Sequence, residues 1–207
     1  MRAKTREIIS ENVEIGEIKR DFPTYKLGEE YLEDVEGLDN PGVKASQIAH
    51  AARDHLHPRE NQNPRYKRLS ERVTDIVERW QGDEIGDPEA VEALKSVEEE
   101  ILNVENEAEE QGMGDAEFAI YTHLTEETPE AIESEEQAEE VAEEIVTEFH
   151  ERVDRSYNGW KTNQKTRQEI MTILLDVLVK NHDLGHLIKE DDEFIDAIRE
   201  YLIRNHG

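Results

Sequence analysis

The clearest periodic pattern in the chain lies between Asn63 and Gly82. Large apolar residues recur there at steps of three and four, which places them on one face of a helix: Tyr66, Leu69, Val73, Ile76, Val77 and Trp80. Asn63 can cap the first free backbone N–H groups, and Pro64 suits the first helical position because it has no N–H to lose. Gly82 can adopt the left-handed conformation that ends many helices. We therefore expect an amphipathic helix here, with Trp80 buried near its end.

The same periodicity predicts helices over residues 41–55, 87–111, 134–153, 164–181 and 192–205, with a short helical segment over 115–124. Ser134 followed by Gln137 has the spacing of a capping box, and Gly112 and Gly185 are suited to close helices. Val43 is expected on the inner face of its helix. Residues 164–181 form the most apolar stretch, which is typical of a central helix. The prediction is an all-α fold of about six amphipathic helices in an irregular bundle.

The N-terminal part of the chain has a weaker pattern. We expect a short helix over residues 2–12 and an extended segment over 22–27, where Pro23 allows at most an edge strand. Residues 1–38 are therefore predicted to be a loosely structured tether, followed by a helical assembly domain over 39–207. A Glu-rich loop is predicted over residues 125–133.

Charge changes this picture more than any motif does. The chain carries 52 acidic residues against 24 Lys plus Arg, for a net charge of -28. At ~1 M salt the screening length falls to roughly 3 Å, so the self-repulsion of such a chain largely disappears. The composition is typical of a halophilic protein. An acidic, partly disordered chain is an alternative, but the long apolar stripes argue against it.

Several chemistries have no signature in this sequence. It contains no Cys, no GxxxxGK[ST] phosphate loop and no GxSxG nucleophile motif. No apolar run approaches 18 residues, which indicates a protein that does not enter a membrane, and the cytoplasm is the expected location. We expect no catalytic residue and no cofactor.

A metal site is the main alternative. The adjacent His182 and Asp183 follow an apolar helix, as in metal-dependent phosphohydrolases of the HD type, where they hold an ion that activates water. His150 could supply an earlier ligand, but Asp191, Asp192 and Asp196 lie closer than that family usually places its last Asp. A polar helix end explains the same residues. His50, His55 and His57 lack the i, i+4 spacing of ligands that share an ion and are interpreted as surface histidines.

Two segments keep positive charge in this acidic chain, and we expect them to contact a partner or DNA. The candidate residues are Arg65, Arg68 and Arg72 on the outer face of the first helix described above, and Lys161, Lys165 and Arg167 near Trp160. The alternative is pairing within one helix, for example between Arg68 and Glu71 or between Arg72 and Asp75.

The order of residues from Ala49 to Trp80 resembles a segment near the C-terminal end of the restriction subunits of type I restriction–modification enzymes. The pattern Pro-x-Tyr-x-x-Leu-Ser-Glu-Arg-hydrophobic is carried here by Pro64, Tyr66, Leu69, Ser70, Glu71, Arg72 and Val73. Later elements are also similar: an acidic helix over 91–110, a Gly turn at 112–114, an aromatic segment at 118–124 and a break at 154–160. The break departs from the pattern, because Trp160 lies six residues after Asp154. Residues 21–33 resemble the linker that leads into this region.

The resemblance implies a C-terminal helical domain that is not catalytic on its own, because the nuclease and the ATP-driven motor of that family are outside this chain. Such a domain would dock the restriction subunit onto the methyltransferase and specificity subunits and meet DNA only indirectly. The alternatives are the HD-type enzyme and a free-standing acidic protein that mimics DNA.

Overall fold

The computed structural model describes residue 35 and residues 37–190 and 192–206. All regular secondary structure in this part of the chain is helical, which confirms the all-α prediction. None of the helices in these ranges is long and apolar enough to cross a membrane. The helix expected over 2–12, the extended segment at 22–27 and the linker-like residues 21–33 lie outside the described residues.

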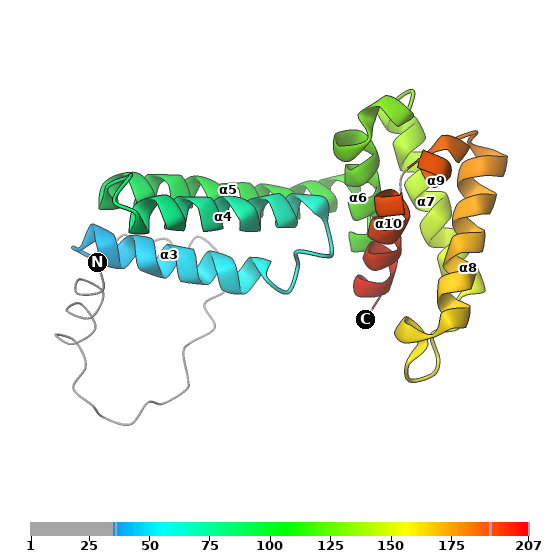
Figure 1. Ribbon diagram of the computed structural model, residues 1–207, viewed down its shortest axis with the longest axis horizontal. Coiled ribbons are helices and arrows are strands. Elements are labelled where there is room, and N and C mark those ends of the chain that lie inside the picture. Colours follow the sequence, from blue (N-terminus) through cyan, green and yellow to red (C-terminus); the bar gives the residue numbers. More distant parts are fainter. Residues whose placement is uncertain (1–34, 36, 191, 207) are drawn as a thin grey trace.

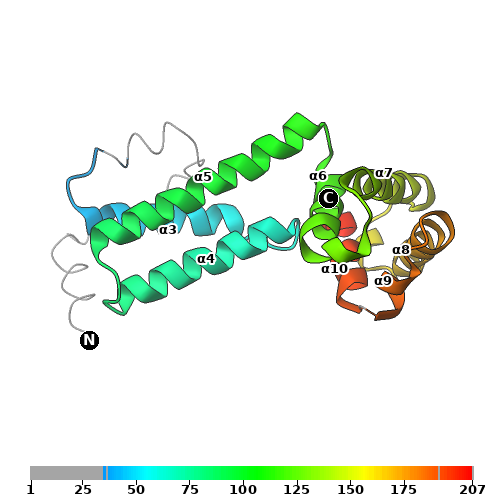
Figure 2. The same ribbon diagram turned by 90° about the horizontal axis from the view of Figure 1, so that it is seen from above.

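Three helices form an elongated arm. They are α3 (Pro41–Leu56), α4 (Pro64–Gln81) and α5 (Asp87–Gln111), and consecutive helices run antiparallel beside one another (Figure 1). The view from above shows that α3 and α4 both lie along α5, so α5 is the common partner (Figure 2). We call these three helices the arm.

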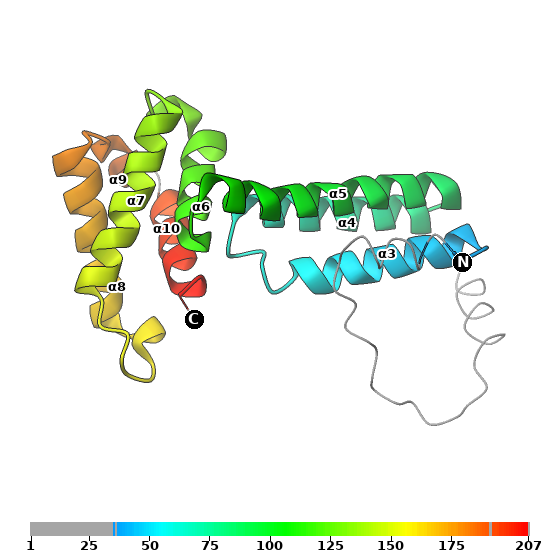
Figure 3. The same ribbon diagram turned by 180° about the vertical axis from the view of Figure 1, so that it is seen from behind.

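The remaining elements form a compact end bundle, defined here as residues 115–206. Its elements are α6 (Asp115–Thr122), η1 (His123–Glu127), η2 (Pro129–Ala131), α7 (Glu135–Arg152), η3 (Trp160–Thr162), α8 (Gln164–Leu174), η4 (Leu175–Asn181), α9 (Gly185–Glu190) and α10 (Asp192–Arg204). The views from the front and from behind both show α6, α7, α8 and α10 standing across the direction of the arm (Figures 1 and 3). The segments η1 and η4 are π-helical turns that continue α6 and α8.

Most of the predicted helix starts are confirmed by side-chain caps. The Asn40 side chain accepts hydrogen bonds from the backbone N–H groups of Gly42 and Val43, and Asn63 accepts one from Arg65. Ser134 accepts one from the Gln137 backbone at 3.2 Å. The capping box is only half formed, because the Gln137 side chain accepts instead from the N–H of Glu133.

The helix ends differ from the prediction at two of three glycines. Gly112 is left-handed with φ 68°, as expected. Gly82 has φ -81°, and the left-handed residue is the next one, Asp83, with φ 59°. Gly185 begins α9, because the chain already turns at Asp183, which has φ 55°. Asp tolerates this conformation better than most residues do, and for that reason the turns can form one position after Gly82 and two positions before Gly185.

Three predictions about burial are wrong. Val43 is 40% exposed, because it lies on the outer side of α3, away from the alanines that pack on α5. Trp80 is only partly buried, and its indole N–H donates to Asp87 Oδ1 at 2.8 Å. The helix over 164–181 is not central. It lies at the far end of the molecule (Figure 1), and Leu175 and Val179 on it are exposed.

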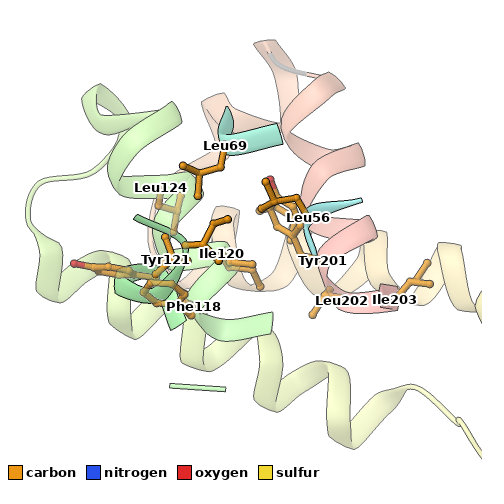
Figure 4. Close-up of a cluster of buried hydrophobic side chains, with 14 of the residues drawn as sticks. Leu56, Leu69, Phe118, Ile120, Tyr121, Leu124, Tyr201, Leu202 and Ile203 are labelled. Atoms are coloured by element: carbon orange, nitrogen blue, oxygen red, sulfur yellow. The ribbon is translucent and has the colours of Figure 1, made fainter. Parts of the chain in front are cut away.

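A cluster of buried side chains joins the arm to the end bundle (Figure 4). Leu56 and Leu69 come from the arm, and Ile120, Leu124 and Tyr201 are among the residues from the bundle. Next to it, Asn205 Nδ2 donates to the backbone oxygen of Gln62, in the loop between α3 and α4, at 3.0 Å. The end of the described chain is thereby bonded to the end of the arm that faces the bundle.

Candidate docking surfaces

Each of the three arginines on the outer face of α4 reaches a carboxylate on another element. Arg65 Nε donates to Glu126 Oε1 of η1 at 2.7 Å, and the same guanidinium bonds Glu107 of α5. Arg68 bonds Glu126 and Glu127, and Arg72 bonds Glu100. Pairing within α4, the alternative considered for Arg68 and Arg72, is therefore replaced by pairing between elements. We call this row of ion pairs the arginine clasp.

The expectation that all three arginines are solvent-exposed is wrong for Arg65. Its side chain is 21% exposed, against 46% for Arg68 and 44% for Arg72. Its guanidinium also lies over the Phe118 ring, 5.5 Å from the ring centre. Burial by itself would lower the pKa of Arg65, but the hydrogen bonds to Glu107 and Glu126 outweigh it and raise the pKa above its usual value. The side chain is thus a fixed cation at the junction of arm and bundle.

A groove of about 430 Å³ runs along the clasp, with Leu69, Asn103 and Val104 between the charged groups. Glu100 and Glu126 line the groove, and Glu107 and Glu127 pair with the same arginines, so the three guanidinium groups of the clasp are matched by four carboxylates. The groove therefore has no excess of positive charge with which to attract an anionic ligand.

The second basic segment leads into α8. Lys161 lies over the ring of Trp160, 5.6 Å from its centre. Lys165 and Arg167 are exposed on the first turns of α8, and within the described ranges neither forms an ion pair. Of the six basic residues expected to contact a partner, these two have the charge most accessible from outside.

The residues of the HD alternative are not brought together around one point. His182 Nε2 lies 2.7 Å from Glu144 Oε2, whereas His150 Nε2 lies 2.6 Å from His206 Nε2 near the end of α10. Asp183 follows His182 but occupies the exposed, left-handed turn. Among the residues that the structure describes, no group of three or more His, Cys, Asp or Glu side chains could hold a metal ion. This geometry gives the metal-dependent mechanism no support.

Sequence reasoning missed the buried carboxylate of Glu98. The residue is 0% exposed on α5, and neither side-chain oxygen has a hydrogen-bond partner among the residues that the structure describes. Burial raises the pKa of the Glu98 carboxyl from 4.5 to about 7, an effect that the nearby Lys95 partly opposes. The sequence does contain a signal for the burial of Glu98, because position 98 continues the apolar stripe through Val91, Leu94 and Ile101.

The fold and these surfaces define a helical unit in which two parts are held in fixed relation, with charged and apolar faces left outside. This chain belongs to a family of such units, the C-terminal domains of endonuclease subunits like that of the type I restriction enzyme HindI, whose sequence model matches residues 14–201. The resemblance of the sequence to type I restriction subunits is thereby confirmed.

One relative is a protein of Methanocaldococcus jannaschii described as a type I restriction enzyme MjaIXP endonuclease subunit. It is 24% identical over 180 residues, which cover 84% of this chain and 17% of the relative. This chain therefore corresponds to about one sixth of the length of that protein. No solved structure matches the chain.

Proposed function

We propose that residues 39–207 form an assembly domain, which docks a type I restriction subunit onto its methyltransferase–specificity complex in defence against foreign DNA. The observation that carries this proposal is the family match over residues 14–201, because the family is defined by the C-terminal region of endonuclease subunits. In this proposal the nuclease and the motor belong to other parts of the enzyme, and the domain itself performs no catalysis. The cytoplasm is the compartment in which it would meet DNA and the methyltransferase.

The construction of the domain supports a docking role. The buried cluster of Figure 4 and the arginine clasp both link the arm to the end bundle, so the two parts are held in one geometry. An interface that is organised before binding loses less conformational entropy when its partner binds. A rigid two-part unit is therefore suited to hold a large enzyme at a set position on a complex.

The two basic segments are the candidates for the surface that contacts the partner. Arg65, Arg68 and Arg72 already hold carboxylates of the same chain, and breaking these pairs would cost part of any binding energy gained. Lys165 and Arg167 are exposed and can meet an acidic partner without such a cost. We assign the arginine clasp to internal support. We assign the basic N-terminal end of α8, together with Lys161 of η3, to partner contact, with DNA contacted only through the complex.

The experiment is reconstitution of the chain with the purified methyltransferase–specificity complex of the same cells, in ~2 M KCl. Size-exclusion chromatography with light scattering should show the chain eluting at the mass of the complex. The chain should give no mobility shift with DNA alone. A chain that does not join the complex, or that instead displaces DNA from it, contradicts the docking proposal, and displacement would favour the DNA-mimic alternative.

A further inference from the structure

Between Gln168 and Val179, none of the exposed residues of α8 and η4 is charged, although more than a third of the residues in the chain are charged. Four exposed residues lie on one face at steps of three and four: Gln168, Thr172, Leu175 and Val179. On its other sides the helix packs against α7 and α10. Figures 1 and 3 both show this helix at the end of the molecule farthest from the arm. We call these four residues the α8 strip.

The strip is apolar at its centre and fixed in place. Leu175 and Val179 are 40% and 42% exposed, whereas Val177 and Leu178 on the inner side are completely buried. Val179 lies beside Gly185, where a Cβ would be in van der Waals contact with it at 3.5 Å. The Leu and Val side chains therefore project from a helix whose inner side is held firmly.

Thr172 adds little to the polarity of the strip. The Thr172 hydroxyl donates to the backbone oxygen of Gln168 at 2.9 Å, four residues earlier in the helix. This bond uses the hydroxyl hydrogen within the helix. The strip thus forms a continuous contact surface about three helical turns long, on which the Gln168 amide is the main group that needs a polar partner.

The charged residues around the strip indicate which kind of partner surface is complementary to it. The two acidic residues of the helix, Glu169 and Asp176, are both bound by Arg152 of α7 at 2.8 Å. Lys165 and Arg167, at the N-terminal end, are exposed and outside any ion pair in the described part of the chain. The strip therefore has a positive end within a strongly negative protein, and a partner surface with carboxylates beside an apolar ridge complements it.

We infer that the α8 strip, with Lys165 and Arg167 at its end, binds an acidic, apolar-centred surface of the methyltransferase–specificity complex. The inference rests on the proposed docking function and names its surface. DNA fits this face poorly, because phosphates need several cations and gain nothing from Leu175 and Val179. In molar salt the burial of apolar area persists while long-range attraction is screened, so an apolar centre with short charge contacts suits those conditions.

The test compares two changes that place carboxylates on equally exposed apolar positions. Leu175→Glu with Val179→Glu alters the strip, whereas Val43→Glu alters α3, where Val43 is also 40% exposed. Affinity of the full chain for the methyltransferase–specificity complex is measured in ~2 M KCl, with melting curves to show that each variant is folded. We expect the double change to weaken binding at least about 30-fold and the α3 change less than about 3-fold. If the first variant unfolds, a milder pair, Leu175→Gln with Val179→Thr, takes its place and should weaken binding several-fold.

The outcomes separate this inference from the function on which it rests. If the wild-type chain binds and the folded strip variants bind equally well, the strip is wrong but docking stands. If the wild-type chain does not bind, both are overturned. If the variants change only self-association of the chain or its affinity for DNA, the occupant is a second copy or nucleic acid, and the inference is also overturned.

Discussion

Arg65 on α4 and Glu126 on η1 are 61 residues apart in the sequence, and the arginine Nε donates to the glutamate Oε1 at 2.7 Å. The same guanidinium bonds Glu107 at the end of α5. One largely buried cation therefore connects two helices of the arm with η1 of the end bundle. This explains why basic residues are retained on α4 without any need for an external partner.

Replacing Arg65 with alanine should destabilise the protein, because Glu107 and Glu126 then lose the cation between them. The expected loss is about 2–3 kcal/mol in the free energy of unfolding, measured by guanidinium denaturation at constant salt. Arg79→Ala is the matched control, since Arg79 is 47% exposed and its one ion pair within the described part of the chain is with Asp75, at 3.7 Å. It should cost less than about 0.5 kcal/mol. Equal effects of the two changes would contradict the internal role of Arg65.

Glu98 should make the stability of the protein depend on pH. Its pKa is raised from 4.5 to about 7 in the folded state, so the stability present below pH 4.5 is lost as the pH rises toward and through 7. Glu98→Gln removes this loss. Its gain in the free energy of unfolding over the wild type should therefore be about 2–3 kcal/mol larger at pH 8 than at pH 5. Urea denaturation at both pH values measures the difference. The exposed Glu92→Gln on the same helix should leave the pH profile unchanged, and an unchanged profile for Glu98→Gln itself would mean that the carboxyl is solvated.

The two tryptophans should differ in their contribution to stability. Trp80 is partly buried and bonds Asp87, so Trp80→Ala should cost about 1–2 kcal/mol. Trp160 is 8% exposed and packs against Phe149, with ring centres 6.2 Å apart, so Trp160→Ala should cost about 3–5 kcal/mol. Thermal melting of both variants in the same buffer gives the comparison. A larger loss at Trp80 would restore the burial first expected from its place in the apolar stripe.

The net charge of -28 predicts a salt-dependent fold. The melting temperature followed by circular dichroism should rise steeply between ~0.1 M and ~2 M KCl, since screening removes repulsion among the carboxylates. Sucrose of equal osmolality controls for solvent effects that do not involve charge. A melting temperature indifferent to KCl, or equally raised by sucrose, would contradict the halophilic interpretation.

The helices could be predicted because their signals are local. The pairs Asn40–Pro41 and Asn63–Pro64 start helices through their own side chains and rings, and the apolar stripe of α7 is buried as expected. The π-helical turns were not predictable in this way, because one extra residue per turn leaves no periodic trace at 175–181. Leu175 and Val179 are exposed at regular steps from Gln168 and Thr172, so their exposure continues the outer face of α8.

The candidate site was only partly predictable. Sequence periodicity identifies the residues that share a face of α4, and the arginines do lie together there. It contains no information on which distant element faces them, so the ion pairs to Glu126 and Glu127 could not be foreseen. The family resemblance came from side chains such as Tyr66 and Leu69, which define the packing of the fold and not a reaction.

Hydrogen exchange measured by mass spectrometry, on the chain alone and bound to the methyltransferase–specificity complex, tests the docking account most directly. Backbone amides are compared in ~2 M KCl over the same exchange times. The account predicts added protection in residues 164–181, with little change in α4, whose arginines are already held within the chain. Protection confined to α4, or no protection anywhere under conditions that saturate the complex, would contradict it.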